Sequence, residues 1–176
     1  MTHNFIVNTR PKNLQLESNQ LLIEAGFEVI GLPCIEIVNN TNPSTLSKLN
    51  SIKQDDVVIF TSQFAVHYVF KLFPNLRFVD SNVVITVGSK TAEVLEQNST
   101  IAFWVPQKQN SEGVIELLQG LKEIPRIVLI TAAEGRGEIQ EFAKLNSICL
   151  DQINVYKRIV PEVDKEVFVL LENLNQ

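Results

Sequence analysis

The chain has 176 residues, of which 45% are hydrophobic and 20% are charged, and its formal net charge is −5. These values are typical of a globular protein with one ordinary domain or two small ones. The basic residues are scattered, without a Lys/Arg stripe interleaved with aromatic residues, so we expect no nucleic-acid partner. No stretch reaches the ~18 apolar residues of a membrane span, and no signal-peptide core occurs before Pro11. We therefore expect a cytoplasmic protein without a membrane partner.

Strand and helix patterns alternate in the first part of the chain, where Gly26 is expected to end the helix. The expected elements are a strand at Phe5–Val7, a helix with apolar residues from Leu14 to Ala25, a strand at Phe27–Ile30 and an extended piece at Cys34–Val38. The polar run Asn39–Ser44 is the best candidate for a domain boundary. The first 36 residues hold only two strands and one helix, which is too little for an independent fold.

Five further strands are expected between about Ser44 and about Asn154. They are Val57–Phe60, Val83–Val87, Ile101–Val105, Arg126–Thr131 and Ile148–Val155, the last running on into Tyr156–Arg158. The helices between them are a shallow one through Leu46, Leu49 and Ile52, then Gln63–Phe73, Lys90–Gln97, a helix through Leu121 with Ser111 as its N-cap, and Glu138–Leu145. This alternation predicts a parallel sheet with helices on both faces, one complete flavodoxin-like α/β domain.

Two of these strands pass abruptly into helices on small hydroxyl residues. The residues at the two junctions are Thr61, Ser62 and Gln63 after the first strand and Ser89, Lys90 and Thr91 after the second. The first N–H groups of a helix have no internal partner and carry partial positive charge, so such junctions can bind carboxylates or phosphates. The alternative is that these hydroxyls only cap their helices. Tyr156 could likewise be only an amphipathic residue at a strand end.

Sequence motifs for cofactors are missing. Gly88–Thr91 lacks the adjacent Gly-Lys of a phosphate loop, and Gly135–Gly137 lacks the third glycine of a dinucleotide fingerprint. No spacing of His, Cys, Asp or Glu indicates a metal site, so we expect no cofactor. Cys34 and Cys149 form no Cys-x-x-Cys pattern, and we expect both to be free, buried thiols.

The order of short motifs along residues 5–161 resembles uroporphyrinogen-III synthase. The matching motifs are Thr9–Pro11, Gly26–Ile30, Leu32–Pro33, Ile35–Ile37, Ile59–Ser62 with Ala65–Val66, Val87–Ala92, Pro106, Ser111–Gly113, Gly135–Arg136 and Val155–Tyr156. Each motif is short, and it is the ordered set with its spacing that is specific. The resemblance implies a cofactor-independent hydro-lyase that cyclises the linear tetrapyrrole hydroxymethylbilane to uroporphyrinogen III, with inversion of ring D and loss of water.

The resemblance also implies the architecture. The family has two flavodoxin-like parallel-sheet domains joined by a two-stranded linker, with the substrate between them and the first domain discontinuous. On this pattern residues 1–36 with 160–176 form the first domain, and residues 37–159 form the second domain with its flanking linker strands. Family members continue beyond the position of Gln176, so the first domain would be truncated at its C-terminus. We expect a monomer, unless another chain supplies the missing half-domain.

Roles for individual residues follow from the same resemblance. Tyr156 matches the family's tyrosine and is the candidate acid or water-orienting group, because a phenol stays protonated at neutral pH. The six junction residues are candidates for binding substrate carboxylates, and Arg10 and Arg136 are weaker candidates. Two alternatives remain: an inactive, truncated homologue, and a flavodoxin-like module that binds another small anion.

Overall fold

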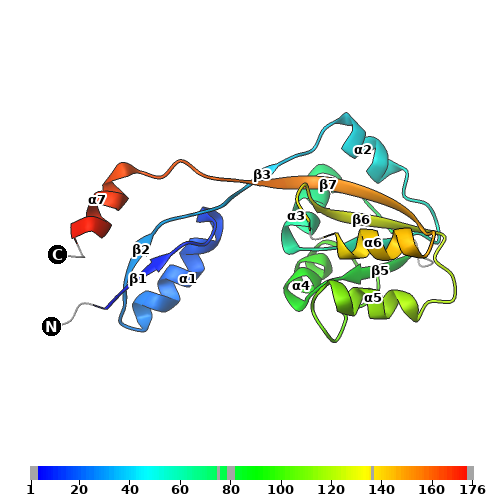
Figure 1. The fold of residues 1–176 in the computed structure, drawn as a ribbon, viewed down its shortest axis with the longest axis horizontal. Coiled ribbons are helices and arrows are strands. Elements are labelled where there is room, and N and C mark those ends of the chain that lie inside the picture. The colour runs from blue at the N-terminus through cyan, green and yellow to red at the C-terminus, as the bar shows by residue number, and fades with distance from the viewer. Residues whose placement is uncertain (1–3, 75, 79–81, 136, 174–176) are drawn as a thin grey trace. The chain divides into compact units, whose positions relative to one another are not determined.

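The structure is a computed structural model that describes residues 4–74, 76–78, 82–135 and 137–173. The chain divides into two compact units (Figure 1), one formed by Met1–Val38 with Arg158–Gln176 and the other by Asn39–Lys157. Each unit is described by itself. No helix in the described ranges is long and apolar enough to cross a membrane.

The first unit is built on a parallel pair of short strands. Its elements are β1 (Phe5–Asn8), α1 (Lys12–Glu24), β2 (Glu28–Gly31) and α7 (Lys165–Asn173). Phe5 lies opposite Glu28 in the parallel ladder, and Gly26 ends α1 with a φ of 89°, as expected of a helix-ending glycine. Gln15 fixes α1 to β1, because its Nε2 donates to the backbone oxygens of Asn8 and Arg10 at 2.9 Å.

Much apolar surface of this unit faces solvent. Leu16 on α1 is 82% exposed, and Val160 is 86% exposed. A hollow of about 720 Å3 lies in the same unit, with Lys12, Pro33 and Val163 among its lining residues. The first unit therefore has few buried apolar side chains.

The second unit contains β4, β5, β6 and most of β7 from a five-stranded sheet with the order β3-β7-β6-β4-β5, whereas most of β3 belongs to the first unit. The strands are β3 (Glu36–Asn39), β4 (Val57–Phe60), β5 (Val83–Thr86), β6 (Arg126–Ala132) and β7 (Cys149–Ile159). The pairs β4–β5, β4–β6 and β6–β7 are all parallel. The predicted α/β fold with parallel sheets is confirmed.

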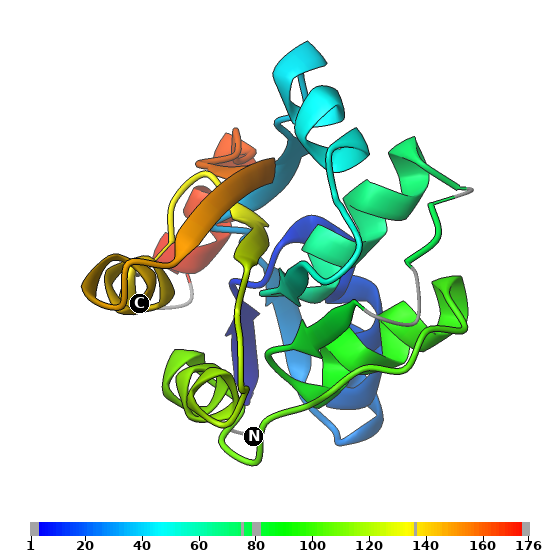
Figure 2. The ribbon, with the colours of Figure 1, turned by 90° about the vertical axis from the view of Figure 1, so that its right-hand side faces the viewer.

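Helices cover both faces of this sheet (Figure 2): α5 (Ser111–Gln119) and α6 (Glu138–Leu145) lie on one side, and α3 (Gln63–Leu72) and α4 (Ser89–Asn98) lie on the other. The apolar side chains that pack with α5 and α6 are Val57, Ile59, Ile85, Ile127 and Leu129. Since side chains alternate along a strand, the intervening residues face α3 and α4. The remaining helix, α2 (Pro43–Asn50), begins at Asn42, whose side chain accepts from Thr45 N in a capping box.

Three sequence expectations differ from the structure. Ile101–Val105 is not a strand, because Trp104 alone forms a bridge, to Ile85, at the open edge of β5 and Trp104 itself is 46% exposed. The N-cap of α5 is Asn110, not Ser111, since the Asn110 side chain accepts from Gly113 N at 3.0 Å. The two cysteines are free but exposed, so their expected burial was wrong.

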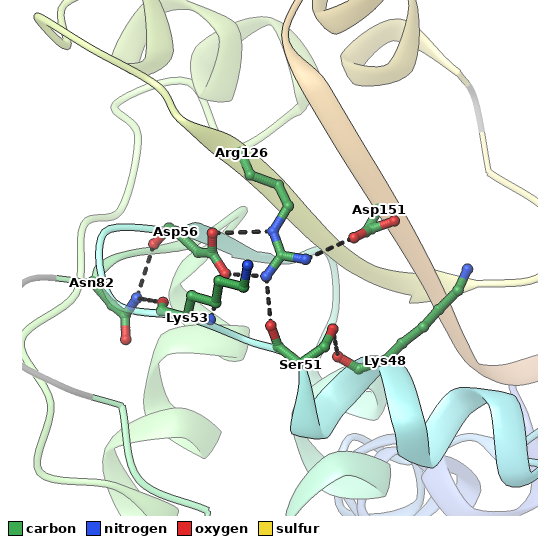
Figure 3. Close-up of polar contacts among 7 residues, drawn as sticks. All are labelled: Lys48, Ser51, Lys53, Asp56, Asn82, Arg126 and Asp151. Atoms are coloured by element: carbon green, nitrogen blue, oxygen red, sulfur yellow. Dashed lines mark hydrogen bonds and ion pairs between the residues drawn. The ribbon is translucent and has the colours of Figure 1, made fainter.

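The amino end of the sheet is held by an ion-pair network around Arg126 (Figure 3). The guanidinium donates to both carboxylate oxygens of Asp56, to Asp151 Oδ2 at 2.9 Å and to the backbone oxygen of Ser51 at 2.7 Å. Asp56 is 3% exposed and also accepts from Lys53 N at 2.6 Å. Burial raises the pKa of Asp56, but the hydrogen bonds from Arg126 and Lys53 outweigh burial and hold that pKa below its ordinary value.

Candidate functional site

The carboxyl ends of β4, β5, β6 and β7 carry the candidate site. These strands run parallel, so their carboxyl ends meet at one edge of the sheet, opposite the Arg126 network. Ligands of open parallel sheets bind at this edge. It is also where α3 and α4 begin, each directly after a strand.

Ser62 is the N-cap of α3. Its Oγ accepts from Ala65 N at 3.2 Å, which satisfies one of the unpaired N–H groups of the first turn. The same oxygen lies 2.9 Å from the hydroxyl oxygen of Tyr156, a hydrogen bond in which either atom could donate. The structure therefore brings together two of the predicted site residues that are 94 positions apart in the chain.

An irregularity in β7 turns Tyr156 toward α3. Asn154 lies opposite Thr131 in the ladder, but the next pair joins Tyr156 to Ala132, so β7 has one extra residue at this point. Such a bulge re-aims side chains, and it places Tyr156 on the sheet face that α3 covers. Tyr156 is 1% exposed, with the ring of Phe64 at a centroid distance of 5.8 Å and the ring of Tyr68 at 6.2 Å.

A second hydroxyl pair lies on the other face of the sheet. Thr61 Oγ1 and Thr131 Oγ1 are 2.9 Å apart, and Thr61 N donates to Ile130 O at 3.1 Å. Thr131 is 6% exposed, and Thr61 is half-buried. The successive residues Thr61 and Ser62 thus serve two different hydrogen-bonded groups.

The start of α4 is occupied by a side chain from another segment. Gly88 is the N-cap, and no side chain caps the helix in the usual manner. Instead Gln109 Oε1 accepts from Ser89 N at 3.0 Å and from Ser89 Oγ at 3.2 Å. A neutral carbonyl oxygen thus lies where the sequence predicts a substrate carboxylate.

The position of Gln109 depends on close packing of its loop against α5. A Cβ added to Gly113 would lie 2.0 Å from the backbone oxygen of Lys108, so only glycine fits there. The same glycine donates its N–H to the Asn110 cap. This packing fixes residues 108–110 beside the N-terminus of α4.

The other candidate residues are less closely grouped. Gln63 is half-buried in the first turn of α3, Thr91 is 6% exposed on the inner side of α4, and Lys90 forms an exposed 3.0 Å ion pair with Glu93. Arg10 is exposed and belongs to the first unit. Arg136 lies outside the described residues.

Comparison with known proteins identifies the family. The model of the family described as uroporphyrinogen-III synthase HemD matches residues 17–174, which is most of the chain. The chain belongs to the uroporphyrinogen-III synthase family. The resemblance found in the sequence is confirmed, and the family is one of hydro-lyases in porphyrin biosynthesis. Nothing in these comparisons favours a different small-anion module or an inactive homologue.

Individual members of the uroporphyrinogen-III synthase family differ in length from this chain. A uroporphyrinogen-III synthase of Proteus mirabilis is 26% identical over 170 residues, which are 94% of this chain and 85% of that protein. A porphyrin biosynthesis protein HemD of Ruminiclostridium josui is 24% identical over 158 residues, 86% of this chain but 31% of that protein. The chain therefore spans most of one relative and under a third of the other.

Solved structures of the uroporphyrinogen-III synthase family share the fold. A mutant of the enzyme of Thermus thermophilus has a TM-score of 0.69 at 13% identity and is matched over 97% of this chain and 67% of its own. The enzyme of Helicobacter pylori has a TM-score of 0.56 at 16% identity, over 96% of this chain and 68% of its own. At this level of identity the likeness concerns the fold alone.

Sequence reasoning missed Thr131, Gln109, Phe64 and Tyr68. The pairs Thr61–Thr131 and Ser89–Gln109 join positions 70 and 20 residues apart. Only Phe64 and Tyr68 carried a local signal, because residues four apart share a helix face. That signal shows that they lie together on α3, but not that Tyr156 lies against them.

Proposed function

We propose that this chain catalyses the cyclisation of hydroxymethylbilane to uroporphyrinogen III, with inversion of ring D and loss of water. The observation that carries the proposal is the 2.9 Å contact between Ser62 Oγ and Tyr156 OH at the N-terminus of α3. Family membership names the reaction, and this pair offers a proton-bearing group beside backbone N–H donors. We infer a cytoplasmic setting and a small-molecule substrate.

Substrate binding is assigned to the two helix starts. The substrate carries acetate and propionate chains, and helix N-termini bind carboxylates through backbone N–H groups. Thr61, Ser62 and Gln63 surround one start, and Ser89, Lys90 and Thr91 surround the other. At the second start a substrate carboxylate would replace the amide oxygen of Gln109. Arg10 and Arg136 are the further candidates for carboxylate contacts.

The chemical step begins with departure of the hydroxyl group. Its C–O bond breaks as the oxygen takes up a proton and leaves as water, and the remaining electron-poor carbon is an azafulvene cation. The Ser62–Tyr156 pair supplies that proton. Attack by the substituted carbon of ring D gives a spiro intermediate, and rearrangement followed by loss of one ring proton closes the macrocycle. One proton is taken up and one is released, so the net loss is water.

Selectivity for the III isomer requires control of geometry more than of acidity. Hydroxymethylbilane closes spontaneously to the uninverted I isomer, so the protein must hold ring D in the arrangement that favours inversion. Positioning of reacting groups can lower a barrier by several kcal/mol. Binding of the carboxylate chains at two fixed helix starts provides such positioning.

The test is the isomer composition of the product. Hydroxymethylbilane is incubated with the purified chain, and the uroporphyrinogens are oxidised and separated chromatographically. We expect the III isomer in excess over a protein-free control. Formation of the I isomer alone would overturn the proposal and would favour an inactive homologue.

A further inference from the structure

We propose that Tyr156 does not touch the substrate but acts through Ser62, whose hydroxyl passes the proton to the leaving group. This inference rests on the proposed function and assigns the roles within the Ser62–Tyr156 pair. Ser62 is then the catalytic residue, and Tyr156 is a positioning residue and proton source behind it. The rings of Phe64 and Tyr68 pack against Tyr156 and hold it behind Ser62.

Ser62 and Tyr156 differ in their exposure to solvent. Tyr156 is 1% exposed, whereas Ser62 is half-buried at the end of the sheet. The Tyr156 ring is contacted by Phe64 and lies nearly parallel to Tyr68, with an interplanar angle of 18°. A large, highly charged substrate can approach Ser62 at the helix start without displacing these rings. It cannot reach the phenol in the same way.

Hydrogen-bond capacity sets the direction of transfer. A serine hydroxyl has one proton and two lone pairs, and one lone pair of Ser62 accepts from Ala65 N. A phenol is a better hydrogen-bond donor than an aliphatic alcohol, so we assign Tyr156 as the donor toward Ser62. With both lone pairs of Ser62 used, its own proton remains for a third oxygen. We assign that oxygen to the leaving hydroxyl group.

The transfer balances within the reaction. Ser62 gives its proton to the leaving oxygen as the C–O bond breaks, and it takes the proton of Tyr156 in return. The phenolate formed is opposite in charge to the azafulvene cation, which offsets the cost of a buried anion. The ring proton lost at closure returns to Tyr156 through Ser62.

The bulge in β7 is what brings the Tyr156 hydroxyl next to Ser62. With regular pairing after Asn154 and Thr131, Val155 would lie opposite Ala132 and Tyr156 would face the opposite side of the sheet. The extra residue brings the phenol under α3 instead. Val155 and Tyr156 are consequently both buried, although they are consecutive in a strand.

The experiment is a double-mutant cycle with steady-state formation of the III isomer as the readout. Ser62→Asn keeps a side-chain acceptor for the N-cap but cannot relay a proton, and Tyr156→Phe removes the proton source and keeps the ring. Each change should lower kcat by about 100-fold, a typical contribution of general acid catalysis. KM should change little, since the backbone N–H groups that bind carboxylates remain. The double variant should be no slower than the slower single variant.

Two further variants separate the relay from a structural role. Ser62→Thr retains both the cap and a transferable proton, so it should restore kcat to near the wild-type level. Gln97→Ala, an exposed change near the C-terminal end of α4, is the control and should leave kcat unchanged. Thermal unfolding of all variants shows whether a loss of rate follows a loss of folded protein.

The outcomes are distinct. If Tyr156 protonates the substrate directly, Ser62→Asn retains most of kcat and the two losses multiply in the double variant, which overturns the inference. Full activity of Tyr156→Phe overturns it as well. If the wild-type chain yields no excess of the III isomer, the proposed function itself fails, and the relay fails with it.

Discussion

The two ends of the five-stranded sheet differ in how their polar groups are used. At the amino end, Arg126 pairs with the buried carboxylate of Asp56 and donates to a backbone oxygen, so the buried carboxylate has its counter-charge within the protein. At the carboxyl end, neutral hydroxyl pairs such as Ser62–Tyr156 lie beside helix starts, whose N–H groups favour anions. One end uses its polar groups to stabilise the fold, whereas the other places small hydroxyl side chains beside helix N-termini, where we propose that a ligand binds. Substitutions at the two ends should therefore separate stability from activity.

The largest effect on stability is expected for Arg126→Met. The change leaves Asp56 buried without its cation, and breaking a buried pair in this way costs about 3 kcal/mol. The free energy of unfolding in urea gives the value. Asp151→Asn is the matched control: its carboxylate is 38% exposed, so it should cost under about 1 kcal/mol. Equal losses for both changes would show that Asp56 does not depend on Arg126.

A somewhat smaller loss is expected for Gly113→Ala. The new methyl group would meet the Lys108 oxygen, and relieving that contact shifts the loop that carries Gln109, at a cost of about 2 kcal/mol. Gly120→Ala is the control, since φ is −79° there and the nearest atom is 3.4 Å away. It should be neutral or stabilise by up to about 1 kcal/mol. Similar urea midpoints for the two variants would contradict the close approach.

Lowering the pH should destabilise the Arg126 network at the amino end of the sheet. Because the pKa of Asp56 lies below its ordinary value in the folded protein, the unfolded chain binds more protons, and stability rises with pH in that range. The contribution is present above the unfolded pKa of about 3.9 and is lost as pH falls through the lower folded value. We expect unfolding free energies measured between pH 6 and pH 3 to fall less steeply for Asp56→Asn than for the wild type. Parallel curves would refute this.

The sequence predicts most of the elements because their signals are local. The buried run at Val57–Phe60 and the periodic helix that follows it fall within one residue of β4 and α3. Ile101–Val105 shows the limit of such signals: it is apolar enough for a strand, but the edge of β5 offers it only one bridge. Strand formation there depends on a partner, which composition does not reveal.

The residue types of the site could be predicted from the sequence, but which of these residues contact one another could not. A hydroxyl after a strand indicates a helix start, and this places Ser62 correctly as an N-cap. Its contact with Tyr156 depends on a bulge in β7, and no local pattern marks the extra residue. The occupation of α4 by Gln109 is likewise set by loop packing against Gly113. What the sequence does not reveal is the register between distant strands and the places where two backbone segments approach closely.

The smallest expected effect on stability, with a measurable effect on binding, concerns Gln109→Ala. The change removes the acceptor for Ser89 N and should cost about 1 kcal/mol, as for a lost helix cap. It also frees the start of α4 for a substrate carboxylate, so KM for hydroxymethylbilane should fall while kcat stays similar. Gln107→Ala, an exposed neighbour in the same loop, should change neither quantity. A higher KM in Gln109→Ala would mean that the amide contacts the substrate instead of occupying its place. An unchanged KM would mean that the Ser89–Gln109 contact serves only the fold, as the Arg126 network does at the amino end of the sheet.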